Sequence, residues 1–279
     1  MGQFRNPIVL AGIAAMALVP PLAGQDRSQA EIARALRSHD RDTVAHALAE
    51  VPLGYDPDDE LGWKFPPDYV VTPELSAALI SALNREARMH MDGCTVTGIG
   101  RRHLELSLEL EHFVIALRDP ASIPALVQVI CSGGAVRQAL MEFGPIIIPH
   151  VVAWARSPDA AWDDVTGSLT TLGEAEEQWG GTMLAETRAS IRDVALLYLG
   201  PPQKRFVEPW SKPWAKRYAL EGAITLASVM RDPVLLAALD GIAEEGHEAF
   251  DGLDPEVANS LRDMARRGLA APVWEIRRK

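Results

Sequence analysis

One short phrase returns along the chain at regular distances, each time followed by an Ala-Leu pair. It begins at Arg41 (Arg-Asp-Thr), at Arg118 (Arg-Asp-Pro) and at Arg231 (Arg-Asp-Pro). The starts differ by 118 − 41 = 77 and 231 − 118 = 113 residues, close to two and three times a unit of about 38 residues. A helical unit of this size cannot bury its apolar face alone, so stacked neighbours share one core. The spacing therefore predicts an all-α fold, an α-solenoid of stacked antiparallel helix pairs, which provides a binding surface.

The N-terminus has the pattern of a secretory signal peptide. Arg5 is the only charge before an apolar run over residues 7–19, and prolines and small residues follow up to Gly24. That run is too short to span a bilayer, and no later stretch reaches the length that a spanning helix needs. We expect residues 1–24 to be a signal peptide and residues 25–279 to form a single exported domain, periplasmic or secreted, with no membrane span.

The net charge excludes some classes of partner. Removing residues 1–24 deletes one cation, which takes the formal net charge from −11 to −12. A chain this acidic is not expected to bind nucleic acid or anionic membranes non-specifically.

The two cysteines are separated by 131 − 94 = 37 residues, about one repeat. Cys94 and Cys131 each lie close to an expected helix C-terminus, so stacking would bring equivalent positions together. Disulfides persist in exported proteins, and we expect one here. Two separately buried thiols are the alternative.

The rest of the chain alternates helical patterns with interruptions. Apolar spacing favours a helix over residues 103–117, although alternating leucines also fit a strand. Ser28 and Glu31 form a capping box, and a helix is expected to start at each of Pro73, Ala215 and Pro255. Residues 52–72, 166–182 and 200–214 are expected to be irregular insertions.

Residues 120–144 carry the best-formed unit: a turn, a helix, a Ser-Gly-Gly turn and a second helix, ended by Gly144 and Pro145. This segment resembles the HEAT and HEAT-like repeat family, and weaker echoes occur near residues 195–200 and 232–243. The resemblance implies a curved solenoid of helix pairs that serves protein binding or assembly and uses no cofactor.

Two Glu-x-x-His strings suggest a competing metal site. They are Glu109 with His112 and Glu244 with His247. Facing pairs of this kind hold two metal ions in some helical proteins, so a metal-dependent enzyme on a HEAT-like scaffold is one alternative function. Solvated polar faces explain the same strings.

Aromatic and cationic residues gather in two proline-rich segments. Such mixtures are typical of interface anchors, and a carbohydrate-binding module would use exposed tryptophans in the same way. The alternative is a loop folded onto its own scaffold. The candidates for partner contact are Trp63, Phe65, Arg205, Phe206, Trp210, Lys212 and Trp214. The sequence thus predicts an exported, non-enzymatic scaffold that binds a protein or peptide.

Overall fold

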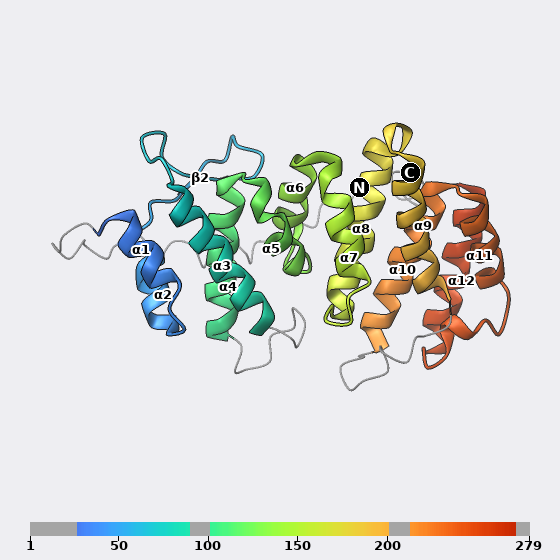
Figure 1. Cartoon of the computed structure of the whole chain (residues 1–279). Helices are drawn as coiled ribbons and strands as arrows, with labels where there is room; N and C mark the ends of the chain where they lie inside the picture. Colours follow the sequence, from blue (N-terminus) through green and yellow to red (C-terminus); the bar gives the residue numbers. More distant parts are fainter. Residues whose placement is uncertain (1–26, 90–100, 201–212, 272–279) are drawn as a thin grey trace.

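The computed structural model describes residues 27–89, 101–200 and 213–271, and these segments are mostly helical (Figure 1). The α-helices are α1 (Gln29–Leu36), α2 (Arg41–Leu48), α3 (Pro73–Met89), α4 (Arg101–Leu117), α5 (Ile123–Gln128), α6 (Gly134–Glu142), α7 (Ile148–Ala155), α8 (Trp162–Trp179), α9 (Ala185–Leu199), α10 (Pro213–Met230), α11 (Pro233–Ala243) and α12 (Pro255–Ala270). Short 3-10 helices are η2 (Pro120–Ser122), η3 (Gly144–Ile147), η4 (Gly180–Thr182) and η6 (Glu248–Phe250). The all-α prediction is confirmed. None of the helices in these segments has the length and apolar character needed to cross a membrane.

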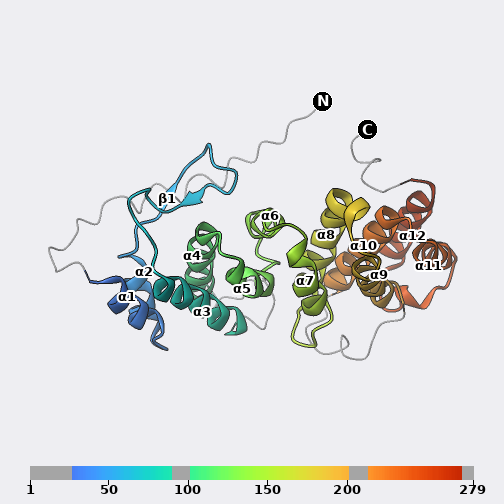
Figure 2. The ribbon, with the colours of Figure 1, turned by 45° about the horizontal axis from the view of Figure 1, so that its top comes forward.

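The helices lie in two layers, which we call the odd and even layers after their labels (Figure 2). Each helix contacts the next one in sequence within the pairs α1/α2, α3/α4, α5/α6, α7/α8, α9/α10 and α11/α12. Along the odd layer, α1, α3, α5, α7, α9 and α11 contact one another in that order. Along the even layer, contacts run from α4 through α6, α8 and α10 to α12. The even layer is tightest between α8 and α10, where Gly222 packs against Leu169.

Two copies of the repeated phrase form the same turn. Arg118 and Arg231 each follow a helix with a φ of 49°, and the next residue, Asp119 or Asp232, caps the following helix. Proline then occupies the first helical position, where its missing N–H is not needed. The first copy is different, because Arg41 already lies inside α2 and Asp40 precedes that helix. The turn that the other two copies share is therefore absent at Arg41.

Arginines connect neighbouring helices by donating to carbonyl groups at helix C-termini. Arg85 donates to the Leu36 carbonyl at the end of α1, and Arg266 donates to the Ala243 carbonyl at the end of α11. Arg231 donates to the carbonyls of Gly268 and Leu269 near the end of α12. A cation at this position satisfies orphan carbonyls and complements the helix dipole.

Replacing Arg231 separates two energetic effects. Alanine removes the hydrogen bonds to α12 and keeps the left-handed backbone, so Arg231→Ala should lower the free energy of unfolding by about 2 kcal/mol. Glycine tolerates a φ of 49°, so Arg231→Gly should be more stable than Arg231→Ala by about 1 kcal/mol. Urea unfolding of both variants measures the difference. An alanine variant at least as stable as the glycine variant would contradict the backbone argument.

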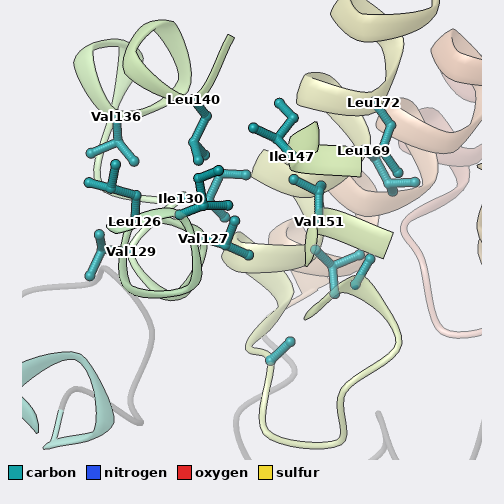
Figure 3. Packing of buried hydrophobic residues seen from close by; sticks show 14 of the residues in the cluster. Leu126, Val127, Val129, Ile130, Val136, Leu140, Ile147, Val151, Leu169 and Leu172 are labelled. Carbon is teal, nitrogen blue, oxygen red and sulfur yellow. The ribbon is translucent and has the colours of Figure 1, made fainter. Parts of the chain in front are cut away.

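The core continues without a break through the middle of the molecule, where helices α5 to α8 meet (Figure 3). Its members here are aliphatic and almost fully buried: Leu126, Val127, Val129, Ile130, Val136, Leu140, Ile147, Val151, Leu169 and Leu172. Gly167 of α8 closely approaches the turn after α5, since a Cβ at this position would lie 2.9 Å from the Ile130 carbonyl oxygen.

Two of the three expected interruptions fall within the described residues. Residues 52–72 contain the short hairpin of β1 (Gly54–Tyr55) and β2 (Trp63–Lys64), with Tyr55 opposite Trp63. The sequence predicts an irregular insertion over residues 166–182. This prediction is wrong, because α8 runs to Trp179. The hydroxyls of Thr170 and Thr171 donate to carbonyls four residues earlier, so these turn-forming residues fit inside a helix. Of the third expected insertion, residues 200–214, the part from 201 to 212 lies outside the described segments.

Two of the three other predicted helix starts are confirmed. Residues 103–117 fall in α4, and helices begin at Pro73 and Pro255 as expected, whereas α10 begins at Pro213, two residues before the predicted start at Ala215. The capping box at Ser28 forms, with the Glu31 carboxylate accepting from the Ser28 backbone N–H at 2.8 Å.

Candidate functional site

The hairpin folds back onto α4, and this places two of the predicted contact residues. The Trp63 ring stacks on the His112 ring with centroids 4.1 Å apart, and the Tyr55 ring meets Trp63 edge-on at 5.3 Å. Phe65 lies 6.4 Å from Phe113, also on α4. Trp63 and Phe65 thus pack on the protein's own scaffold, and burial lowers the pKa of His112.

Polar contacts hold the same hairpin against α4 and α6. Arg118 forms a two-pronged ion pair with the Asp59 carboxylate, at 2.5 and 2.7 Å, and Gln138 donates to the Glu60 carbonyl at 3.0 Å. The Leu61 backbone N–H, and after it the Arg118 guanidinium, lower the pKa of Asp59.

The other aromatic candidates are placed only in part. Arg205, Phe206, Trp210 and Lys212 lie outside the described residues, and Trp214 falls in the first turn of α10. Their role in partner contact stays a prediction.

The four metal candidates do not form one site. Glu109 and His112 lie on α4, whereas Glu244 ends α11 and His247 caps η6 at the opposite end of the molecule (Figure 1). Within the described segments there is no group of three or more His, Cys, Asp or Glu residues placed to hold a metal ion. The structure therefore does not bring the two Glu-x-x-His pairs face to face, as the metal hypothesis requires.

The disulfide prediction is not tested. Cys94 lies outside the described residues, and the segments that the structure describes contain no free cysteine.

An open groove lies between α6 and α8 in the even layer, with a volume of about 460 Å³. Its walls are two helix faces: Gly134, Arg137, Gln138 and Met141 from α6, and Glu174, Glu177 and Gln178 from α8. Gly167 of α8 packs against the turn that follows α5, and it lies 174 − 167 = 7 residues before Glu174, about 10 Å along the helix. Beyond that contact the short α6 leaves the C-terminal half of α8 partly uncovered.

The charges in this groove are partly desolvated. Burial raises the pKa of Glu174, the Arg137 guanidinium opposes this shift, and the neighbouring Glu177 carboxylate adds to it. Among the described residues, the buried Nε of Arg137 has no hydrogen-bond partner. The groove therefore contains both a carboxylate and a donor that are poorly solvated.

More carboxylates line the rim beside the hairpin. Burial raises the pKa of Glu142, the Arg118 guanidinium opposes it, and the carboxylates of Glu60 and Asp59 add to it. The described residues named in these two interactions include five carboxylates and two guanidinium groups, a formal charge of 2 − 5 = −3 when all are ionised. This part of the surface favours a cationic guest.

A different carboxylate, Glu176, has a structural role on the same helix. Its side chain is 6% exposed and pairs with Arg188 of α9 at 2.5 and 3.3 Å. Arg188 also donates to the Met230 carbonyl at the end of α10, so one side chain joins three helices.

Removing Arg188 should destabilise the fold. Arg188→Met leaves the Glu176 carboxylate buried without its cation, and we expect the free energy of unfolding to fall by about 2 kcal/mol, less than for a fully buried pair because Arg188 is itself 41% exposed. The matched control is Arg192→Met on the same helix. Its ion pairs, at 3.3 and 3.8 Å, are with carboxylates that are 52% and 24% exposed, so their loss should cost less than about 1 kcal/mol. Equal losses in urea unfolding would refute the role assigned to the buried carboxylate.

Comparison with known proteins gives no guide to a family. No family model, no curated protein and no solved structure matches this chain. The HEAT-like resemblance of residues 120–144 therefore rests on those residues alone.

The groove residues were not among the sequence candidates. A signal was present on α6, where Gly134, Arg137, Gln138 and Met141 share one helix face. The sequence gives no such signal for the opposite wall, because it predicts an irregular insertion over residues 166–182.

Proposed function

We propose that this protein is an exported, non-enzymatic scaffold whose helix pairs form a HEAT-like solenoid that binds a protein or peptide partner. The observation that carries the proposal is the open groove between α6 and α8 in the even layer. The ordered contacts of the two layers are those of an array in which each helix pair touches its neighbours. Export rests on the signal-peptide pattern of residues 1–24.

A repeat array of this kind supports binding because its surface is long and rigid. The core runs continuously from α1 to α12, so the groove lies on an ordered framework and needs little reorganisation to receive a guest. The aromatic residues of 200–214 remain a second candidate for contact with the same partner.

The test is affinity capture from the native envelope fraction with the purified protein as bait, followed by reconstitution with each captured protein in purified form. We expect one protein to bind at a fixed ratio, and Trp210→Ala with Trp214→Ala to weaken that binding. Unchanged binding by the double variant would show that these two tryptophans do not contact the partner. Recovery of no protein above a heat-denatured bait would contradict the scaffold function itself.

A further inference from the structure

We propose that residues 272–279 fold back onto their own chain and dock on a row of exposed aliphatic side chains at the starts of α11 and α9. This contact within one molecule does not depend on the proposed binding function.

Exposed aliphatic side chains gather along one edge of the array, where an even-layer helix connects to the next odd-layer helix. Val234, in the first turn of α11, is 50% exposed, and Leu184, just before α9, is 64% exposed. Ile146 before α7 and Val70 before α3 occupy the corresponding positions and are also exposed. Because α7, α9 and α11 contact one another in turn, their starts form a row with a spacing of about 10 Å. An exposed apolar row of this kind is typical of a contact surface.

The chain leaves α12 at one end of this row. Arg231, in the turn before α11, donates to the Leu269 carbonyl near the end of α12, so the end of α12 lies beside the start of α11. Pro272 disfavours a helical backbone at the preceding residue, and Ala271 is indeed extended, with a φ of −153° and a ψ of 159°. Residues 272–279 therefore begin close to Val234.

The length of this segment limits which part of the row it can cover. Its 279 − 271 = 8 residues span up to about 26 Å when extended. The start of α9 lies one helix away from the start of α11, about 10 Å, whereas the start of α3 lies four helices away, about 40 Å. The segment can therefore reach Val234 and the neighbourhood of Leu184, and it cannot reach Val70.

The first half of the segment offers apolar side chains to this row. Trp274 and Ile276 are two residues apart, and side chains two residues apart face the same way in an extended chain. They would cover Val234 and the surface between it and Leu184, which removes apolar area from water on both sides.

The second half of the segment carries three consecutive cations, Arg277, Arg278 and Lys279, in a chain whose formal net charge is −11. The last turn of α8 contains no basic residue, and the first turn of α9 carries the exposed Glu186. Both the carbonyl groups at a helix C-terminus and a nearby carboxylate attract a cation. The charge pattern therefore favours the direction from α11 toward the connection between α8 and α9.

The test replaces Trp274 with a benzophenone amino acid in the full protein, which keeps a large aromatic side chain at this position. Isotope-labelled and unlabelled batches of this variant are mixed in equal amounts and irradiated, and the crosslinked peptides are identified by mass spectrometry. We expect adducts with residues around Val234 and Leu184, and we expect both peptides of each adduct to carry the same isotope because the contact lies within one chain.

Substitutions in the same protein separate the apolar contact from the charge. Val234→Ser should lower the adduct yield by about fivefold or more, because it removes the apolar surface beneath residue 274. Replacing Arg277, Arg278 and Lys279 together with glutamine should lower it by about twofold or more. The matched control is Val70→Ser, the same change at the corresponding position before α3, which should leave the yield unchanged. Val234 and Val70 are both exposed, so neither substitution should alter the circular dichroism spectrum.

Four results would overturn the inference. Adducts that join differently labelled chains would place the contact between copies of the protein, and adducts elsewhere, or none, would remove the docking site. Equal losses from Val234→Ser and Val70→Ser would remove the apolar contact, and an unchanged yield in the glutamine variant would remove the role of the cations. None of these results bears on the scaffold function, which the capture of a partner tests separately.

Discussion

Replacing Leu140 with alanine is expected to lower the free energy of unfolding by about 4 kcal/mol. Leu140 lies on α6, is 0% exposed and belongs to the buried cluster of Figure 3. The substitution removes buried methyl and methylene groups and leaves a cavity, which the surrounding helix pairs can close only in part. Because neighbouring pairs share this core, the loss should reduce the stability of both halves of the molecule.

Leu184→Ala is the matched control. Leu184 precedes α9 and is 64% exposed, so the same chemical change should alter stability by less than about 0.5 kcal/mol. Urea unfolding followed by circular dichroism measures both variants. A loss below about 1 kcal/mol for Leu140→Ala would mean that the centre of the array is not packed as the structure shows.

Stability should fall as the pH rises from about 5 to 8, and Glu111 is expected to account for about 3 kcal/mol of this change. Glu111 is 5% exposed. It accepts a hydrogen bond from the Ser132 hydroxyl at 2.8 Å and forms a second side-chain hydrogen bond with Ser107. Burial raises its pKa from 4.5 to about 7, while the two serine hydroxyls oppose the shift.

The direction follows from proton binding. Between pH 4.5 and 7 the folded state holds a proton on Glu111 that the unfolded state has released, so raising the pH favours unfolding. Asp164 acts in the same sense, because burial raises its pKa from 3.8 to about 7. Each group's contribution to the free energy of unfolding is complete at a pH below its pKa in the unfolded state, and it is lost above about pH 7.

Glu111→Gln should therefore flatten the pH dependence and exceed the original protein in stability at pH 8, with little difference at pH 5. Glu245→Gln, which changes an exposed glutamate, should keep the original profile. Unfolding free energies measured across this range test the prediction. A Glu111→Gln profile parallel to that of the original protein would show that Glu111 ionises normally in the folded state.

Local sequence signals predicted the helix boundaries well where short-range chemistry decides them. Ser28 with Glu31, and the Arg-Asp-Pro turns at Arg118 and Arg231, are capping arrangements in which a few neighbouring residues determine the backbone. The similar phrase at Arg41 lacks proline, and there the helix starts two residues earlier in the phrase.

Long-range packing explains the errors. Gly167, Thr170 and Thr171 have turn-forming propensities, but burial against neighbouring helices keeps them inside α8. This same misassignment hid Glu174 and Glu177 as a wall of the groove. The sequence predicts Trp63 as a partner contact because it lies in a proline-rich segment, and only the fold reveals that its ring stacks on His112.

The most direct test of the binding function is photo-crosslinking in the native cell from two positions. A benzophenone amino acid replaces Gln178 in the groove in one variant and the exposed Asp240 of α11 in the other. The proposed function predicts an adduct with one protein from position 178 and none from position 240. No adduct from position 178, or the same set of adducts from both positions, would contradict partner binding in the groove.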